Sequence, residues 1–256
     1  MGLTMKVIAI IQARMNSARL PGKVLMPLAN KPVLAHIIER LSYCKLVENI
    51  LIATSHEDSD DSIAEYCENN NIDYYRGSLD DVLDRYYKAA KTYHAETILR
   101  ITADCPVIDP IVVDAVIAGY LSNKYDLYGL GGEFPDGLDC TVFSFTALEK
   151  AWKRAKLKSE REHVCPYIEK NPQMFNNGML ELFRGLDKHR WTLDMPSDYK
   201  LLSKIFDQLY REQSPFLTHE ILQFIQRNPK LQAINSDIVR NEGYQKSIQE
   251  ENINNG

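Results

Sequence analysis

Four short apolar runs, separated by helix-like patterns, constrain the fold of this chain more than any other feature of its sequence. The runs are β-branched and almost continuously hydrophobic, as is typical of parallel strands buried on both faces, and they occupy residues 6–12, 49–54, 72–77 and 96–102. Apolar residues recur at helical spacing between and after them, in segments 33–41, 82–93 and 110–120. Strands that alternate with helices through short connections predict right-handed βαβ units, and therefore an α/β fold.

The middle of the chain departs from this alternation. A glycine-rich loop is expected at 129–137 and opens it, followed by two strands at 138–144 and 178–183 and two helices at 146–157 and 160–170. We interpret the segment of about 129–190 as a small inserted α+β subdomain that covers the rim of the sheet as a lid and carries the contact between subunits. A last strong helix is expected after Pro196. The main domain then spans 5–240, and residues 241–256 form a polar tail that is expected to fray.

Composition excludes several classes of protein. The 256 residues fit one large domain, and 35 acidic against 30 basic side chains leave a net charge of −5. This charge argues against a nucleic-acid partner or a membrane-surface partner, either of which would favour a basic excess. The longest apolar runs are far shorter than the ~20 residues of a membrane helix, and no signal peptide is recognisable. Five scattered cysteines without a CxxC pair suit a reducing compartment. We therefore expect a soluble cytoplasmic protein.

The segment QARMNSARLPGK at 12–23, directly after the first expected strand, is the most informative part of the sequence. It places Arg14, Arg19 and Lys23 on one turn at the carboxyl end of a strand, where α/β sheets bind their ligands. A triphosphate needs such fixed donors and positive charge; the alternative is a solvated basic loop. The phosphate-binding patterns GxxxxGK[ST] and GxGxxG are absent, which excludes a P-loop and a dinucleotide fingerprint.

This loop, extended to IQARMNSARLPGKVL, resembles the signature loop of the cytidylyltransferases that make CMP-activated sugars, the CMP-Kdo and CMP-acylneuraminate synthetases. From about Lys6 to Tyr244 the chain more closely resembles the spore-coat polysaccharide biosynthesis protein F family within that group. Besides the loop, the motifs that carry the resemblance are RGSLDDVLDRYY at 76–87, RITADCP at 100–106, FPDGLDCTVFS at 134–144, EREHVCPYI at 160–168 and RWTLDMPSDY at 190–199. The resemblance implies a Rossmann-like (GT-A-like) nucleotidyltransferase fold with a mostly parallel sheet flanked by helices.

The resemblance also implies where a nucleotide binds. Side chains of the first loop would surround the triphosphate, namely Arg14, Ser17, Arg19 and Lys23, with Gln12, Ala13, Thr102 and Ala103 beside them. Thr54, Ser55, Arg76 and Ser78 match positions near the nucleoside, although hydroxyl side chains are also ordinary turn residues. Two departures from the relatives stand close to the phosphates: Gln12 where proline is frequent, and Ala103 where glycine is frequent.

Two aspartates match the metal-binding carboxylates of the family. Asp104, after an expected buried strand, and Asp194, in TLDMPSDY, would together hold the catalytic Mg²⁺. Mg²⁺ prefers one or two carboxylates together with phosphate oxygens and water. The alternatives are helix or turn caps, with Asp194 as the N-cap before Pro196.

Polar residues in the later motifs match the acceptor side of the family. Asp139, Arg161, Glu162, His163 and Arg190 are the candidates for binding a sugar acid, with an arginine for its carboxylate and short polar side chains for its hydroxyls. For Arg161 and Glu162 the alternative is a solvated start of a helix, and a lone histidine is more often a surface or packed residue.

Together these features predict a Mg²⁺-dependent cytidylyltransferase that couples CTP to a ulosonic-acid-like sugar, with release of pyrophosphate, for surface polysaccharide synthesis. The resemblance implies a homodimer. Two alternatives stay open: an enzyme of the same fold that uses another nucleotide or acceptor, and a non-catalytic nucleotide-binding protein of polysaccharide assembly.

Overall fold

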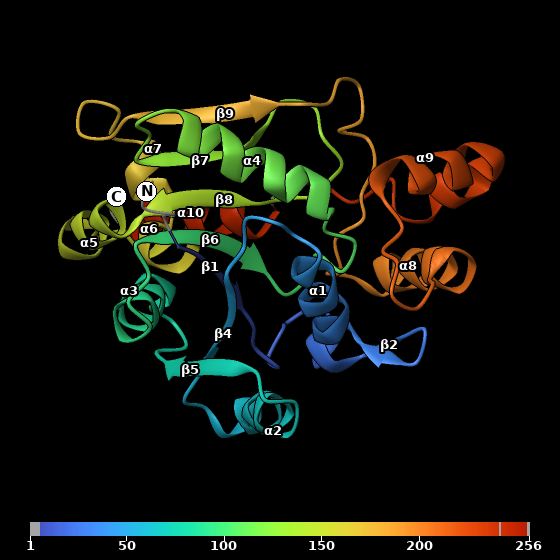
Figure 1. Ribbon diagram of the computed structural model, residues 1–256, viewed down its shortest axis with the longest axis horizontal. Helices are drawn as coiled ribbons and strands as arrows, with labels where there is room; N and C mark the ends of the chain where they lie inside the picture. Colours follow the sequence, from blue (N-terminus) through green and yellow to red (C-terminus); the bar gives the residue numbers. More distant parts are fainter. Residues whose placement is uncertain (1–5, 241, 255–256) are drawn as a thin grey trace.

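The computed structural model describes residues 6–240 and 242–254, and its centre is one seven-stranded sheet of order β5-β4-β1-β6-β8-β7-β9 (Figure 1). Strand β8 is antiparallel to both of its neighbours, and the other pairs are parallel. This arrangement confirms the mostly parallel α/β sheet that the sequence predicts. The strands are β1 (Val7–Gln12), β4 (Asn49–Ser55), β5 (Asp73–Gly77), β6 (Thr97–Thr102), β7 (Leu127–Gly131), β8 (Thr141–Ser144) and β9 (Asn177–Glu181).

Helices cover both faces of the sheet (Figure 1). The hydrophobic core on one face includes residues of α1 (Val33–Ser42), α2 (Asp61–Asn69), α4 (Pro110–Ser122), α8 (Pro196–Leu209) and α9 (Thr218–Arg227). The core on the other face includes residues of α3 (Val82–Thr92), α5 (Phe145–Arg154) and α7 (Pro166–Glu169). The short helix α6 (Lys158–His163) packs on α3 and α7. The remaining elements are the hairpin β2 (Pro27–Leu28) and β3 (Lys31–Pro32), and the 3₁₀ turns η1 (Lys23–Leu25), η2 (Asp58–Asp60) and η3 (Pro229–Ile234).

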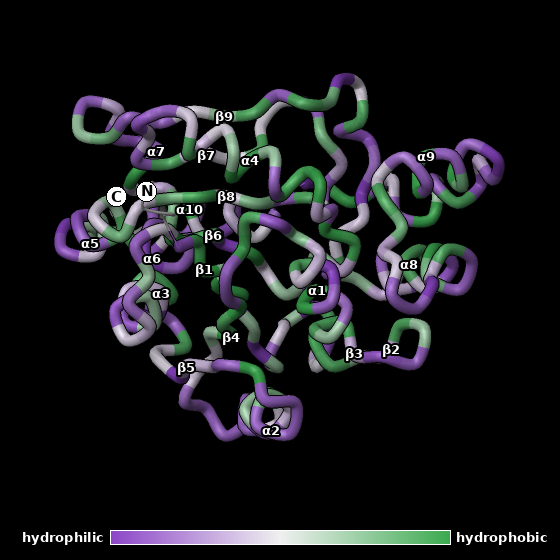
Figure 2. Tube along the Cα trace, viewed as in Figure 1, coloured by the Kyte–Doolittle hydropathy of each residue, from purple (hydrophilic) through white to green (hydrophobic). Residues whose placement is uncertain are grey.

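Alternation along the strands produces these two cores. In β1, Ala9 and Ile11 lie in one core whereas Ile8 and Ile10 lie in the other, because successive side chains of a strand point to opposite faces. Figure 2 shows the consequence: the residues of the central strands are mostly hydrophobic, and those on the outer turns of α2 and α9 are mostly hydrophilic.

The middle of the chain differs from the expected insertion, because β7, β8 and β9 extend the main sheet rather than forming a sheet of their own. Part of the glycine-rich stretch is strand β7 and not loop. A Cβ on Gly129 would lie 3.3 Å from Thr141 Oγ1, and a Cβ on Gly131 would lie 2.7 Å from Met179 Sδ. These glycines therefore allow close packing of neighbouring side chains within the sheet.

The C-terminal segment also differs from the expected fraying tail. Residues Glu242–Asn254 form helix α10, which packs along α6 (Figure 1). Within residues 6–240 and 242–254, no helix is long and apolar enough to cross a membrane.

Candidate active site

The site is built where the carboxyl ends of the adjacent parallel strands β1 and β6 meet. Gln12 is the register partner of Thr102, and the amide of Ala103 donates to the carbonyl of Gln12 at 3.0 Å. The first loop leaves β1 at this point, and the residues leading to Asp104 leave β6 beside it. The structure therefore brings together the two segments that the sequence assigns to phosphate and metal, at the edge where α/β sheets bind ligands.

A buried carboxylate holds the first loop in place. The carbonyl of Met15 accepts hydrogen bonds from the amides of Ser17 and Gly22, at 2.9 and 2.8 Å, so the loop turns back on itself. Gly22 has a φ of 73°, a conformation that favours glycine. The amide of Met15 donates to Asp60 Oδ1 at 2.7 Å, and Asp60 also accepts hydrogen bonds from the amide and hydroxyl of Ser55. In the sequence, Asp60 is marked only by its position directly before α2.

Lys23 joins the two predicted metal-binding carboxylates. Its Nζ lies 2.6 Å from Asp194 Oδ1 and 3.2 Å from Asp104 Oδ2. The carbonyl of Asp104 accepts hydrogen bonds from the amide of Leu193 at 2.7 Å and from the hydroxyl of Thr192 at 3.2 Å. These backbone contacts fix the segment before α8 against the end of β6, and so they place the two carboxylates around one cation.

Arg19 contacts the same carboxylate from the loop. Its Nη2 lies 3.0 Å from Asp194 Oδ2, and its Nη1 lies 2.8 Å from Glu242 at the start of α10. Arg14, the third predicted loop cation, is exposed and forms no ion pair with the residues that the structure describes. Two of the three predicted cations thus lie at Asp194, and the third faces solvent.

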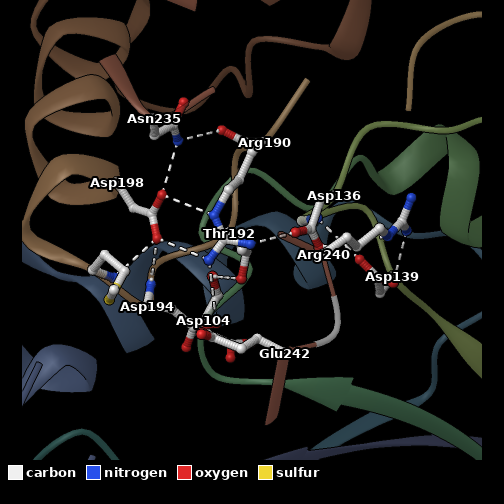
Figure 3. Close-up of polar contacts among 12 residues, drawn as sticks. Asp104, Asp136, Asp139, Arg190, Thr192, Asp194, Asp198, Asn235, Arg240 and Glu242 are labelled. Atoms are coloured by element: carbon white, nitrogen blue, oxygen red, sulfur yellow. Dashed lines mark hydrogen bonds and ion pairs between the residues drawn. The ribbon is translucent and has the colours of Figure 1, made fainter. Parts of the chain in front are cut away.

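Arg190 lies behind Asp194 in a buried network of acidic side chains (Figure 3). Its guanidinium donates to Asp136 at 2.7 Å and to both oxygens of Asp198 at 3.0 and 3.1 Å, and it lies 3.4 Å from Asp194. The side-chain amide of Asn235 donates to Asp198 at 2.8 Å. Every contact that the structure gives the Arg190 guanidinium is with a carboxylate of the protein itself.

Asp198 caps helix α8. One oxygen of its carboxylate accepts hydrogen bonds from the amides of Asp194 and Met195, both at 2.9 Å. A side chain that reaches back from the first turn satisfies amides that a helix leaves free. The alternative reading of Asp194 as the N-cap is therefore not supported, because Asp198 caps the helix and the Asp194 carboxylate points to Lys23 and Arg19.

The opposite charges of Lys23 and Asp104 shift the pKa values of both groups. Burial acts to raise the pKa of Asp104, but the ammonium of Lys23 and the hydrogen bonds to the carboxylate hold this pKa below its usual value. Burial acts to lower the pKa of Lys23, and Asp104 and Asp194 together raise it above its usual value. The site is thus ionised, with one cation shared between two carboxylates.

The donor set fits a magnesium ion. Asp104 and Asp194 already share one cation, and among the described residues no group of three or more His, Cys, Asp or Glu side chains could hold a metal. A site of two carboxylates leaves coordination positions for phosphate oxygens and water, which is the usual environment of Mg²⁺ in nucleotide enzymes.

The predicted nucleoside-binding residues lie at the ends of β4 and β5. Arg76 donates to the carbonyls of Ser55 and Glu57, and its Nη1 lies 2.7 Å from Asp61. The hydroxyl of Ser78 accepts from the amide of Asp81. Buried oxygens of Gln12 and Thr54 have no hydrogen-bond partner among the described residues. Arg76 and Ser78 have structural partners, and binding of a nucleoside by these residues stays a prediction.

The predicted acceptor residues separate into three places. Arg190 lies in the acidic network, and Asp139 accepts from the amide of Gly137 and lies 3.2 Å from Arg240. Arg161 donates to Asp81 through two nitrogens, at 2.6 and 2.8 Å. Glu162 and His163 both contact Ser247 of α10. Binding of an acceptor by these five residues stays a prediction.

The geometry of the site can now be compared with known proteins. A family model described as cytidylyltransferase matches residues 8–226, most of the chain. The chain belongs to the cytidylyltransferase family. It is 40% identical to the protein MJ1063 of Methanocaldococcus jannaschii, over 91% of this chain and 96% of that protein. It is 32% identical to the spore coat polysaccharide biosynthesis protein SpsF of Bacillus subtilis, over 87% of this chain and 95% of that protein.

Solved structures agree with this assignment. A cytidylyltransferase from Leptospira borgpetersenii superposes with a TM-score of 0.85 at 33% identity, covering 92% of this chain and 99% of that one. A CMP-2-keto-3-deoxy-manno-octonic acid synthetase in complex with CTP superposes with a TM-score of 0.62 at 15% identity, covering 80% of this chain and 100% of that one, which shows the shared fold. The resemblance predicted from the motifs is confirmed, and the protein is a nucleotidyltransferase of the cytidylyltransferase family.

Proposed function

We propose that this cytidylyltransferase transfers the CMP group of CTP to a hydroxyl of a ulosonic-acid-like sugar, for the synthesis of a surface polysaccharide. One observation carries the proposal: Asp104 and Asp194 face each other across Lys23, directly beside the first loop. An ammonium group, a guanidinium group and a pair of carboxylates at one sheet edge provide what phosphoryl transfer requires, namely positioning and compensation of charge.

In the proposed reaction the acceptor hydroxyl attacks the α-phosphorus of CTP. The new bond joins the acceptor oxygen to the α-phosphorus, the bond from the α-phosphorus to the bridging oxygen breaks, pyrophosphate leaves, and the proton of the acceptor hydroxyl passes to solvent. Lys23 and Arg19 offset the charge of the phosphates, and no covalent intermediate with the protein is needed. Asp104 and Asp194 would hold Mg²⁺, which acts as a Lewis acid on phosphate oxygens when bound.

The names of two similar proteins support the substrates. SpsF is named for spore coat polysaccharide, and the synthetase of similar fold uses CTP and a keto-deoxy sugar acid. The test is a screen of pyrophosphate release with CTP, UTP, GTP and ATP against a panel of keto-deoxy sugar acids, with identification of the product by mass spectrometry. We expect release from CTP with at least one acid and a product that contains CMP. Equal release from all four nucleotides would contradict selection of cytosine.

We further propose that the enzyme acts in the cytoplasm as a homodimer formed through the segment 129–190. Strand β9 is an edge of the sheet; Met179 within it is 59% exposed, and Leu182 directly after it is 49% exposed. An uncovered edge with apolar side chains favours pairing with another chain. Light scattering of the wild type and of Met179→Glu tests this proposal: we expect a dimer that the variant weakens, and a monomeric wild type would contradict it.

A further inference from the structure

The C-terminal helix α10 contacts three of the side chains that the sequence assigns to substrates. Glu242 Oε2 accepts a hydrogen bond from Arg19 Nη1 at 2.8 Å. Ser247 Oγ donates to Glu162 at 3.1 Å and lies 3.2 Å from His163 Nε2. One helix thus reaches both the predicted triphosphate side and the predicted acceptor side of the site.

The second half of α10 lies along the start of α6. Lys158 Nζ lies 3.0 Å from Glu250 Oε2, and the hydroxyl of Ser159 donates to Glu251 at 2.9 Å. The ring of Tyr244 packs edge-on against His163, with a centroid distance of 5.0 Å. Helix α10 is therefore attached along α6 by one ion pair, several hydrogen bonds and one ring contact.

The contact between Glu242 and Arg19 is of a kind that is easily broken, whereas the hydrogen bonds of Ser159 and Ser247 involve buried side chains. Neither hydrophobic core includes a residue of α10 among the described side chains. The Glu242 and Arg19 side chains are 57% and 33% exposed. An exposed ion pair contributes only about 0–1 kcal/mol, and a helix outside both cores is held by less free energy than the helices that form them. Local opening of such an element is favoured over opening of the core.

Glu242 and a triphosphate would compete for the same donor. Arg19 already contacts Asp194 at 3.0 Å through Nη2, so Glu242 occupies the other terminal nitrogen of the guanidinium. Phosphate oxygens bind guanidinium groups through short, charge-assisted and often bidentate hydrogen bonds. Each terminal nitrogen keeps a second N–H group, so the competition is electrostatic: the Glu242 carboxylate offsets the charge of Arg19 and would repel a phosphate bound there.

We propose that α10 gates the active site. In the protein without nucleotide, Glu242 pairs with Arg19, and Ser247 contacts Glu162 and His163. Binding of the nucleotide then releases the helix from α6. The proposal rests on the proposed function, because that function assigns a triphosphate to Arg19. A helix that serves only as a fixed wall of the site would stay docked or become more ordered when substrate binds, so the direction of the change separates the two roles.

Hydrogen–deuterium exchange of the full-length protein, with and without CTP and Mg²⁺, measures that direction. We expect slower exchange in the loop 13–22 and faster exchange in 242–254. Slower exchange in the loop with unchanged or slower exchange in α10 would overturn the gate and leave the triphosphate site standing. No change in the loop would overturn both the triphosphate site and the gate.

Affinity measurements on single variants provide the second test. Glu242→Gln removes the competing carboxylate, so we expect the Kd for CTP to fall about two- to fivefold, as loss of an exposed ion pair allows. Ser247→Ala loosens the helix without a change of charge and should lower the Kd by a smaller factor. Glu212→Gln makes the same charge change at an exposed position before α9 and should leave the Kd unchanged.

Other outcomes contradict the gate. An unchanged or weaker affinity in Glu242→Gln would show that the carboxylate does not compete with nucleotide. If Glu242→Gln binds CTP more tightly but Ser247→Ala binds it with unchanged affinity, the effect comes from the local charge alone. The proposal that the helix is released would then be wrong.

Discussion

Lys23 Nζ lies 2.6 Å from Asp194 Oδ1 and 3.2 Å from Asp104 Oδ2, so one ammonium group compensates two carboxylates from distant parts of the chain. Lys23 is also largely buried. A lysine in this position does more than line a basic loop, because it holds together the two segments that form the site. Its removal should therefore affect stability as well as catalysis.

Lys23→Met should lower the melting temperature in metal-free buffer. The variant leaves two partly buried carboxylates without their shared cation, at a cost of about 1–3 kcal/mol after allowance for their partial exposure. Addition of Mg²⁺ should recover more stability in the variant than in the wild type, since a metal ion can replace the lost charge. Thermal unfolding in EDTA and in millimolar Mg²⁺ measures both effects. Lys88→Met, which removes an exposed lysine paired with Asp84, is the control, and a similar loss in both variants would contradict the bridging role of Lys23.

Asp194 and Asp198 should respond in opposite ways to replacement by asparagine. Asp194→Asn should lose only about 1 kcal/mol of stability, because Lys23 keeps Asp104 as its partner and asparagine still accepts hydrogen bonds, while turnover falls by orders of magnitude because the metal loses a carboxylate. Asp198 is fully buried, caps α8 and pairs with Arg190. Asp198→Asn should therefore lose about 3–5 kcal/mol of stability. Urea unfolding and kinetics on both variants give the comparison, and equal losses of stability would show that Asp194 also carries the cap.

Arg190→Met tests whether this arginine acts on the structure or on the acceptor. Removal of the guanidinium leaves the buried Asp198 without a counter-ion and Asp136 with Arg240 alone, at 3.9 Å, so we expect a loss of about 3–5 kcal/mol. The measurement is the free energy of unfolding, with Arg211→Met as the control because Arg211 forms an exposed pair with Glu220. Wild-type stability together with a raised KM for the acceptor would instead assign Arg190 to the sugar.

The stability of the fold should decrease below neutral pH because of His36. Burial lowers the pKa of His36, whose Nε2 donates to the carbonyl of Leu28 at 2.7 Å and whose ring packs on Phe206. In the unfolded chain the pKa of histidine is about 6.5, so as the pH falls through this value the unfolded state binds a proton that the folded state excludes. Stability is then lost from about pH 7.5 downward until the lower folded pKa is reached.

His36→Gln should flatten this dependence, since glutamine keeps a donor and has no titratable group. Burial also lowers the pKa values of His163 and His189, so the relevant quantity is the difference between variant and wild type. This difference is obtained from denaturant midpoints of both proteins, measured between pH 5 and pH 8. Parallel curves for the two proteins would contradict the assignment to His36.

The sequence predicts those parts of the fold that depend on local pattern. The runs at 6–12 and 96–102 are strands because their β-branched residues are buried on both faces, and Pro110 after Asp109 begins a helix, where the Asp109 side chain accepts from the amide of Ile111. The sequence also predicts that Asp104 lies close to the first loop, because neighbouring parallel strands end at the same edge of a sheet. The structure adds Asp194 to this edge through the backbone contacts of Thr192 and Leu193.

The remaining features depend on contacts between distant segments, which a local pattern does not reveal. Arg190 was a candidate for the acceptor, yet it lies among carboxylates because Asp136 and Asp198 come to it from a loop and a helix. Strand β7 was read as loop because its glycines suggest a turn until Thr141 and Met179 are seen against them. Helix α10 is mostly polar, and Tyr244 and Ile248 are among its few apolar residues, so the sequence gives only a weak amphipathic signal for its docking on α6.

The most direct test of the central claim compares CMP transfer by the wild type with that by Asp194→Asn. Both proteins are incubated with CTP, Mg²⁺ and the acceptor selected in the screen, and pyrophosphate and the CMP-sugar are quantified together. The account predicts equal amounts of the two products with the wild type, and rates lower by orders of magnitude with the variant at near-native thermal stability. Full activity of Asp194→Asn at ordinary Mg²⁺ would contradict the two-carboxylate site, and the absence of a CMP-sugar with the wild type would contradict the proposed reaction.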